Sequence, residues 1–109
     1  MAAIPVNLVI EKGTDFEASF NITNEDGSPL NLLGYTASCR FKKSYNAVSF
    51  IQINVNFVSR PGGIISMVMT NGQTNALERR RYAYEIVITS PSGYKTRVVE
   101  GVATVTGGL

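Results

Sequence analysis

The sequence DFEASFNITNEDGSPLNLLGYTASCRF, residues 15–41, decides the fold of this chain. Apolar and polar residues alternate in its first and last parts, and the six residues NEDGSP between them are typical of a tight turn. The apolar positions are Phe16, Ala18, Phe20 and Ile22, then Tyr35, Ala37, Cys39 and Phe41. Because successive side chains leave opposite faces of a pleated strand, each part predicts a strand with one buried face.

The same pattern continues on both sides of this stretch. It predicts seven strands, at residues 6–10, 15–22, 35–43, 51–57, 64–70, 82–89 and 95–105. A single helical turn within residues 71–77 is expected to cap one end, and the leucines of residues 30–33 to bury themselves at the rim. Since no long helical pattern occurs, the sequence predicts an all-β, seven-stranded antiparallel β-sandwich. We expect one domain over residues 1–109, with short N- and C-terminal arms.

Two local features refine this prediction. Val98 and Val99 are adjacent and Glu100-Gly101 interrupts the alternation of the last strand, which a bulge at the glycine would explain. Tyr82 or Tyr84, early in the sixth strand, is a candidate tyrosine corner whose hydroxyl binds upstream backbone, the alternative being ordinary core packing.

The totals exclude several classes of protein. With ten basic and eight acidic residues, the net charge of +2 is too balanced for a nucleic-acid binder. No run approaches the roughly 20 apolar residues that span a bilayer, and no signal peptide is recognisable, so we expect synthesis in the cytoplasm and no membrane partner. Cys39 is the only cysteine and is expected to be a small buried residue.

Residues that could carry chemistry are missing. The chain has no histidine, which removes the commonest general base and metal ligand. A lone cysteine cannot form a zinc site without histidines. A glycosidase needs a pair of acids, but Glu11, Asp15, Glu17, Glu25 and Asp26 all lie in or beside turns, where solvated acids are expected. The spacing of the last four matches no calcium loop. We therefore predict no enzyme, no catalytic residue, no cofactor and no metal.

Interface residues are the remaining candidates. Tyrosine and arginine often anchor protein interfaces, and five of them lie in predicted loops or strand starts. These interface candidates are Tyr45, Arg79, Arg80, Arg81 and Tyr94. The arginine run has two interpretations, a solvated loop or a contact patch for an acidic protein surface. Residues 2–7 and 104–109 are apolar and uncharged for chain ends, and either form arms to neighbouring subunits or complete the sandwich.

Several motifs carry a resemblance to a known family. They are IEKGTDF (10–16), FNIT (20–23), DGSPLNLLGYT (26–36), GIISM (63–67), YAYEI (82–86) and SPSGY (90–94). In this order they resemble the small immunoglobulin-like domains of tailed-bacteriophage structural proteins, and in particular the N-terminal domain of phage baseplate upper proteins. The resemblance covers roughly residues 8–105. It departs at Asn31-Leu32-Leu33-Gly34, where the family has Asp-Leu-Thr-Gly, and at residues 79–81, where a turn glycine is usual.

The resemblance implies a non-enzymatic structural protein of a phage virion, made in the host cytoplasm. We expect a stand-alone subunit that docks on other phage structural proteins of the tail or baseplate, in several copies of a symmetric assembly. One alternative is a capsid decoration protein that bridges shell subunits. Another is a host-glycan-binding module, for which Tyr45, Asn46 and Tyr94 form the candidate set.

Overall fold

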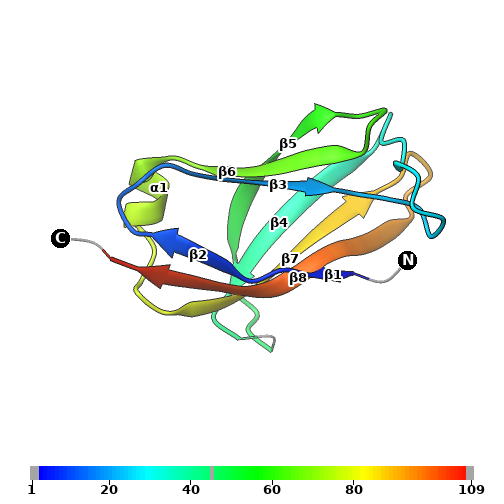
Figure 1. The fold of residues 1–109 in the computed structure, drawn as a ribbon. Helices are drawn as coiled ribbons and strands as arrows, with labels where there is room; N and C mark the ends of the chain where they lie inside the picture. The colour runs from blue at the N-terminus through cyan, green and yellow to red at the C-terminus, as the bar shows by residue number, and fades with distance from the viewer. Residues whose placement is uncertain (1–2, 45, 108–109) are drawn as a thin grey trace.

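The computed structural model describes residues 3–44 and 46–107, which form eight strands and one short helix (Figure 1). The elements are β1 (Ile4–Pro5), β2 (Leu8–Glu11), β3 (Phe16–Asn21), β4 (Thr36–Lys42), β5 (Ile51–Ser59), β6 (Ile64–Met69), α1 (Asn71–Asn75), β7 (Arg81–Thr89) and β8 (Lys95–Thr106). The last six strands match their predicted ranges to within two residues at each end, and the predicted helical turn is α1.

The strands form one curled sheet that closes into two layers. Their order is β1-β8-β7-β4-β5-β6-β3, and β2 also pairs with β8. β5 joins the layers, because residues 51–53 pair with β4 whereas residues 54–59 pair with β6. Figure 1 shows β3 and β6 facing β7 and β8 across the interior. The predicted all-β sandwich class is confirmed.

The prediction was wrong at the start of the chain. Residues 6–10 were expected to form one strand, but the structure has β1 and β2, and both run parallel to β8. The sheet therefore has eight strands and is mixed. The ladder breaks because Val6 N donates to Glu100 O (2.9 Å) while the Asn7 side chain accepts from Val102 N (3.1 Å). Here a side chain replaces the backbone partner that a continuous strand would offer.

The bulge in β8 lies three residues before its predicted place. The register between β7 and β8 shifts between Ile86 and Val87, which leaves Val98 as the extra residue. The shift explains why the adjacent Val98 and Val99 are both buried. The prediction that the bulge falls at Gly101 was wrong.

Gly101 has another role, at a contact that we call the Val6 junction (Val6, Asn7, Tyr84 and Gly101). A Cβ at residue 101 would collide with the carbonyl oxygen of Val6. The Tyr84 side chain lies opposite Gly101 in the β7–β8 ladder, and its hydroxyl donates to the same carbonyl at 2.5 Å. The missing side chain therefore allows the N-terminal segment to lie close against β8.

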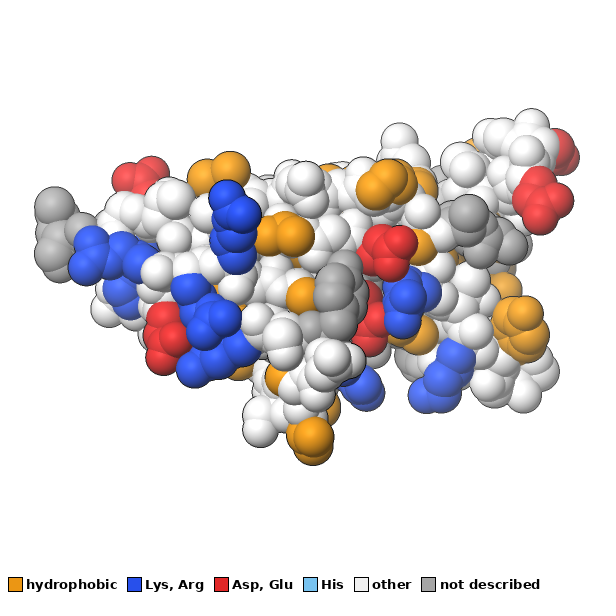
Figure 2. All heavy atoms as spheres, turned by 90° about the horizontal axis from the view of Figure 1, so that it is seen from below, with side chains coloured by type: hydrophobic (Ala, Val, Ile, Leu, Met, Phe, Trp, Pro, Cys, Tyr) orange, Lys and Arg blue, Asp and Glu red, His pale blue; other side chains and the backbone are white. Residues whose placement is uncertain are grey.

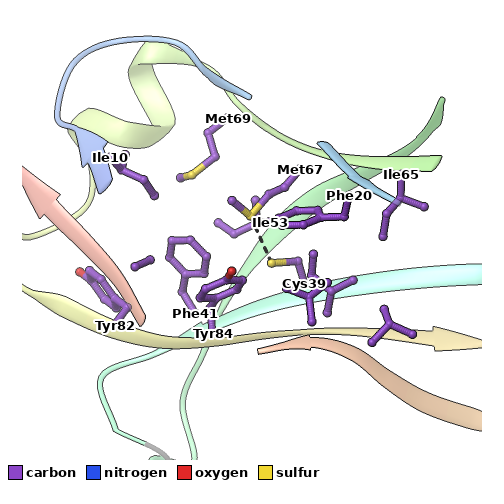
Figure 3. Packing of buried hydrophobic residues seen from close by; sticks show 14 of the residues in the cluster. Ile10, Phe20, Cys39, Phe41, Ile53, Ile65, Met67, Met69, Tyr82 and Tyr84 are labelled. Carbon is purple, nitrogen blue, oxygen red and sulfur yellow. Dashed lines mark hydrogen bonds between the residues drawn. The ribbon is translucent and has the colours of Figure 1, made fainter. Parts of the chain in front are cut away.

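The core lies between the two layers (Figure 3). The Phe41 ring contacts the rings of Tyr82 and Tyr84, with both centroid distances at 5.8 Å. Cys39 is fully buried, as predicted, and its Sγ lies 3.4 Å from the Met67 sulfur. The predicted inward residues of β6, Ile65, Met67 and Met69, are all buried.

Helix α1 closes one end of the sandwich. Thr70 and Gln73 form a reciprocal capping box at its start. The buried Thr74 hydroxyl donates to Thr14 O at 2.7 Å and accepts from Gly13 N at 3.0 Å, which fixes the β2–β3 turn against the helix. The Lys12 ammonium donates to backbone carbonyls of the helix end and of the segment after it.

Residues 30–35 close the opposite end. Leu32 is fully buried as predicted, whereas Leu33 is 58% exposed, so the expectation that these leucines are all buried was wrong. Arg60 holds this segment. Its Nη1 donates to Leu32 O (3.1 Å) and Tyr35 O (2.9 Å), and its guanidinium lies 3.9 Å from the Phe57 ring centroid.

Candidate interaction site

The buried thiol is not a nucleophile. Burial, with a smaller contribution from Glu85, raises the pKa of Cys39 to about 12. The thiol therefore stays protonated at neutral pH. Among the residues that the structure describes, no group of three or more acidic, cysteine or histidine side chains lies close enough to hold a metal ion. Within the same residues, none of the helices has the length and apolar character needed to cross a bilayer.

The structure separates the predicted interface residues into two groups. Arg79, Arg80 and Arg81 precede or begin β7, and Arg81 pairs with Thr104. Tyr94 lies in the turn after the other end of β7. A strand of this length places the two groups roughly 25 Å apart, at about 3.3 Å per residue. Tyr45 lies outside the described residues.

This separation also bears on the glycan-binding set. Asn46 lies in the β4–β5 loop, which is at the same end as the start of β7, because Lys42 pairs with Ala83. Tyr94 is at the opposite end. Asn46 and Tyr94 therefore cannot line one sugar site, and the proposed set was wrong in this respect.

The tyrosine corner is formed by Tyr82. Its hydroxyl accepts a hydrogen bond from Glu78 N, four residues upstream, at 3.0 Å, and its side chain is 1% exposed. The buried ring thus fixes the backbone just before the arginine run. Tyr84 uses its hydroxyl in the Val6 junction.

The arginine run lies against the start of the β4–β5 loop. Arg80 Nη2 donates to Lys43 O at 3.1 Å, and Lys43 forms a 3.3 Å ion pair with Glu78. The Arg80 guanidinium also lies 5.7 Å from the Tyr82 ring centroid. Both side chains of the ion pair are more than half exposed, so the pair contributes little to stability. Arg79 and Arg81 are exposed.

The β4–β5 loop exposes apolar side chains next to these arginines. Val48 is 93% exposed, Phe50 44% and Ile51 41%. The Phe50 ring lies beneath the Arg40 guanidinium, with its centroid 4.5 Å from Cζ. In Figure 1 this loop projects below the sheets, and Figure 2 shows Lys and Arg side chains gathered beside a projecting lobe.

Two apolar hollows flank the loop and share Ile51. The first has a volume of about 140 Å³ and includes Phe41, Phe50 and Tyr82 in its lining. The second, of about 330 Å³, opens where β5 leaves β6, and is lined largely by Ile53, Met69, α1 and the residues just after it. We call the whole feature the loop surface. It comprises Lys43, residues 47–51 and residues 76–81.

Sequence reasoning gave no weight to Val48 and Phe50. The sequence does contain a pattern that marks these two residues. The inward positions of β5 alternate from Ile51 onward, and Val48 and Phe50 lie out of phase with them. Phe50 falls on the outer face with Gln52, where an aromatic side chain has no core to enter. Apolar residues in the wrong phase beside a basic run are therefore the pattern that identifies this surface.

The Tyr94 end has a larger but more polar hollow. Its volume is about 570 Å³. Arg97 is one of its lining residues and forms ion pairs with Glu85 at 2.7 Å and Glu100 at 3.5 Å. The hollow is lined by Ala3, Leu30, Tyr35, Ile88, Tyr94, Lys95, Thr96, Arg97 and Glu100.

The comparisons with known proteins establish the fold and nothing more specific. No protein-family model matches the chain, and no curated protein matches its sequence. Among solved structures, an internalin-like protein of Listeria monocytogenes is similar, with a TM-score of 0.51 and 12% identity. The match covers 95% of this chain and 28% of that chain, so this chain spans little more than a quarter of that protein's length. At this identity the similarity concerns architecture, and one architecture serves many functions.

Proposed function

We propose that this chain is a non-enzymatic structural protein of a tailed-bacteriophage virion, an assembly and docking subunit of the tail or baseplate. The assignment to a phage is supported by the motif resemblance, in which the turn and strand motifs follow one another in the family's order. The docking role is supported by the loop surface, which is independent of that resemblance.

The observation that carries the docking role is the exposure of Val48, Phe50 and Ile51. The core cluster of the sandwich contains none of them. Phe50 and Ile51 instead line hollows at one end, and Val48 projects from the same loop into solvent. Contiguous exposed apolar groups with a polar rim favour a protein contact. The sandwich then acts as a rigid holder for this end, because the Tyr82 corner and Arg80 tie the loop surface to β7.

Several copies in a symmetric assembly would strengthen such a contact. A surface of this size gives weak attachment when it acts alone. Identical copies held by neighbouring virion proteins attach together, and their effective concentration raises the overall affinity without new contacts.

Two alternative functions can be tested by similar experiments. A capsid decoration protein would use the loop surface to bridge shell subunits. A host-glycan-binding module would use the hollow at the Tyr94 end, where Tyr35, Tyr94, Arg97 and Glu100 combine aromatic and hydrogen-bonding groups. A glycan array tests the latter, since an assembly subunit gives no saturable sugar binding.

Mass spectrometry of purified virions tests the proposal, after heads and tails have been separated. We expect the chain in the tail fraction, in a copy number that matches tail symmetry. Recovery with heads at hundreds of copies would replace the tail role with the decoration role. Absence from both fractions would refute the virion assignment.

A further inference from the structure

The positive charge of the chain is concentrated at the loop surface and the strand beside it. Residues 40–43 and 78–81 contain six of the ten basic residues and one acidic residue, a net charge of +5. The remaining four basic and seven acidic residues give the rest of the chain −3. The whole chain has a net charge of only +2, but this end of it is strongly basic.

The basic groups surround the apolar ones. Arg40 lies over Phe50 on one side, and Lys43 lines the smaller hollow. Arg80 reaches the loop from the other side through Lys43 O. Two acids lie near these groups. Glu78 is ion-paired with Lys43, and Glu85, opposite Arg40 in the β4–β7 ladder, is ion-paired with Arg97, so neither is paired with Arg79, Arg80 or Arg81.

We propose that the loop surface binds an acidic segment of a partner protein that inserts an apolar side chain beside Ile51. This inference rests on the proposed docking function and names the partner's chemistry. Carboxylates of the segment pair with the guanidinium groups of Arg79, Arg80 and Arg81, which suit bidentate contacts. Its apolar side chain covers Val48 and Phe50 and fills a hollow that the domain leaves open.

A protein segment fits this surface better than a nucleic acid. The exposed apolar groups are mainly aliphatic, at Val48, Ile51 and Ala76, and the half-buried Ala47 lines the smaller hollow. Single-stranded nucleic acids need aromatic platforms on which bases stack, and Phe50 is already covered on one face by Arg40.

Selection from a library of random twelve-residue peptides tests the inference. We expect the enriched peptides to share a Leu, Ile, Met or Phe flanked by Asp or Glu. Synthetic copies titrated into the ¹⁵N-labelled chain should shift the amide resonances of residues 46–51 and 76–82, and leave those around Tyr94 unchanged. Binding should weaken as sodium chloride rises, because exposed charge pairs are screened.

Matched variants separate the two parts of the surface. Replacing Arg79, Arg80 and Arg81 together by Ser should weaken peptide binding by about tenfold or more, through loss of charge pairing. Val48→Ser should weaken it by about fivefold, because the covered apolar area is lost. The control is Tyr94→Ser with Lys95→Ser, which removes an exposed aromatic group and a charge from the opposite end and should change nothing.

Four results would overturn the inference. They are failure of any peptide to be enriched, equal binding to the triple variant, resonance shifts confined to the Tyr94 end, and tighter binding of a twelve-nucleotide oligothymidylate at the same residues. Failure of the proposed function has a different signature. If the chain is absent from virions but the peptides bind as expected, the proposed docking surface is supported and the proposed virion role is refuted. If the triple variant still enters virions normally, the virion role stands and this surface is not its attachment site.

Discussion

At the Val6 junction the chain satisfies its polar groups and closes its packing, whereas at the loop surface it leaves apolar groups in solvent. Val6 O accepts from the Tyr84 hydroxyl, and Gly101 allows the two backbones to touch. At the other site Val48 is 93% exposed and Phe50 is 44% exposed. Both regions belong to the same sandwich. We infer that the junction contributes to the stability of the fold, whereas the loop surface contributes to binding.

The comparison separates residues that hold the fold from residues available to a partner. A change at the junction removes contacts that already exist, so it should lower the free energy of unfolding. A change at the loop surface removes contacts that form only with a partner, so it should alter binding and leave stability intact.

Gly101→Ala should have the largest effect on stability of the changes at the Val6 junction. The added Cβ collides with the Val6 carbonyl, so either β8 or the N-terminal segment must move. We expect a loss of about 3 kcal/mol in the free energy of unfolding, measured by urea denaturation. The loss of stability cannot exceed the cost of detaching β1 and β2 from β8. Such detachment would speed hydrogen exchange at the Val102 amide, which donates to the Asn7 side chain.

Gly72→Ala is the matched control for this change. Gly72 lies in α1 with a negative φ, and its new Cβ would meet nothing closer than 3.9 Å. We expect stability to change by no more than about 0.5 kcal/mol, since alanine is favoured in helices. Equal losses for the two variants would show that the close approach at Gly101 is not what matters.

Arg60→Met tests whether the closure at residues 30–35 behaves like the junction. Methionine keeps the apolar stem, but it loses the hydrogen bonds to Leu32 O and Tyr35 O and the stacking on Phe57. We expect a loss of about 2 kcal/mol in thermal or urea unfolding. Arg79→Met, at an exposed site of the loop surface, should cost less than about 0.5 kcal/mol. A neutral Arg60→Met would mean that the burial of Leu32 and the backbone hydrogen bonds of this segment hold it without the guanidinium.

Tyr84→Phe isolates one hydrogen bond of the junction. The ring remains, while the Val6 carbonyl loses the hydroxyl that donates to it. We expect a loss of about 1.5 kcal/mol, because a part-buried acceptor is left without its partner. Tyr94→Phe removes a hydroxyl from a side chain that is 74% exposed and should leave the urea midpoint unchanged. If both variants unfold at the wild-type midpoint, the hydroxyl contributes nothing to the junction.

Alkaline pH should weaken the core by a smaller amount. Burial raises the pKa of Cys39 from its usual 9.0 to about 12, so folding favours the protonated thiol. That stability is fully present below pH 9 and is lost as the pH rises through 12. Relative to pH 8, we expect a loss of about 1 kcal/mol at pH 10 from this group. In Cys39→Ala the loss between the two pH values should shrink by that amount, whatever the variant costs at pH 8, and an unchanged pH dependence would contradict the assignment.

The strands were predictable because alternation is a local signal. The ladders that contain Phe20, Phe41 and Ile86 have one apolar face each, and those strands appear close to their predicted bounds. The parallel pairing of β1 and β2 was not predictable in this way. It depends on Asn7 and Gly101, which meet across more than 90 residues of sequence.

The candidate site was only partly predictable for a similar reason. The arginine run stands out in the sequence by charge, but its neighbours are set by the tertiary fold. Lys43 meets Arg80 because β4 and β7 are paired in register, and Tyr94 is distant because it follows the far end of the same strand. The alternation of apolar and polar residues shows which face of a strand a residue occupies. Only the pairing of the strands shows which residues lie at the same end of the sandwich.

Val48→Ser should have the smallest effect on stability. It is best compared with the same substitution at a buried valine. Because Val48 is 93% exposed, replacing it by a polar residue removes almost no buried area, and we expect a change below about 0.5 kcal/mol. The same substitution at Val98, which is 1% exposed, should cost about 3 kcal/mol, since it leaves a void and an unpaired hydroxyl in the core. Urea unfolding of both variants measures the difference. If Val48→Ser costs as much as Val98→Ser, the β4–β5 loop belongs to the core in solution, and its apolar side chains are not held open for a partner.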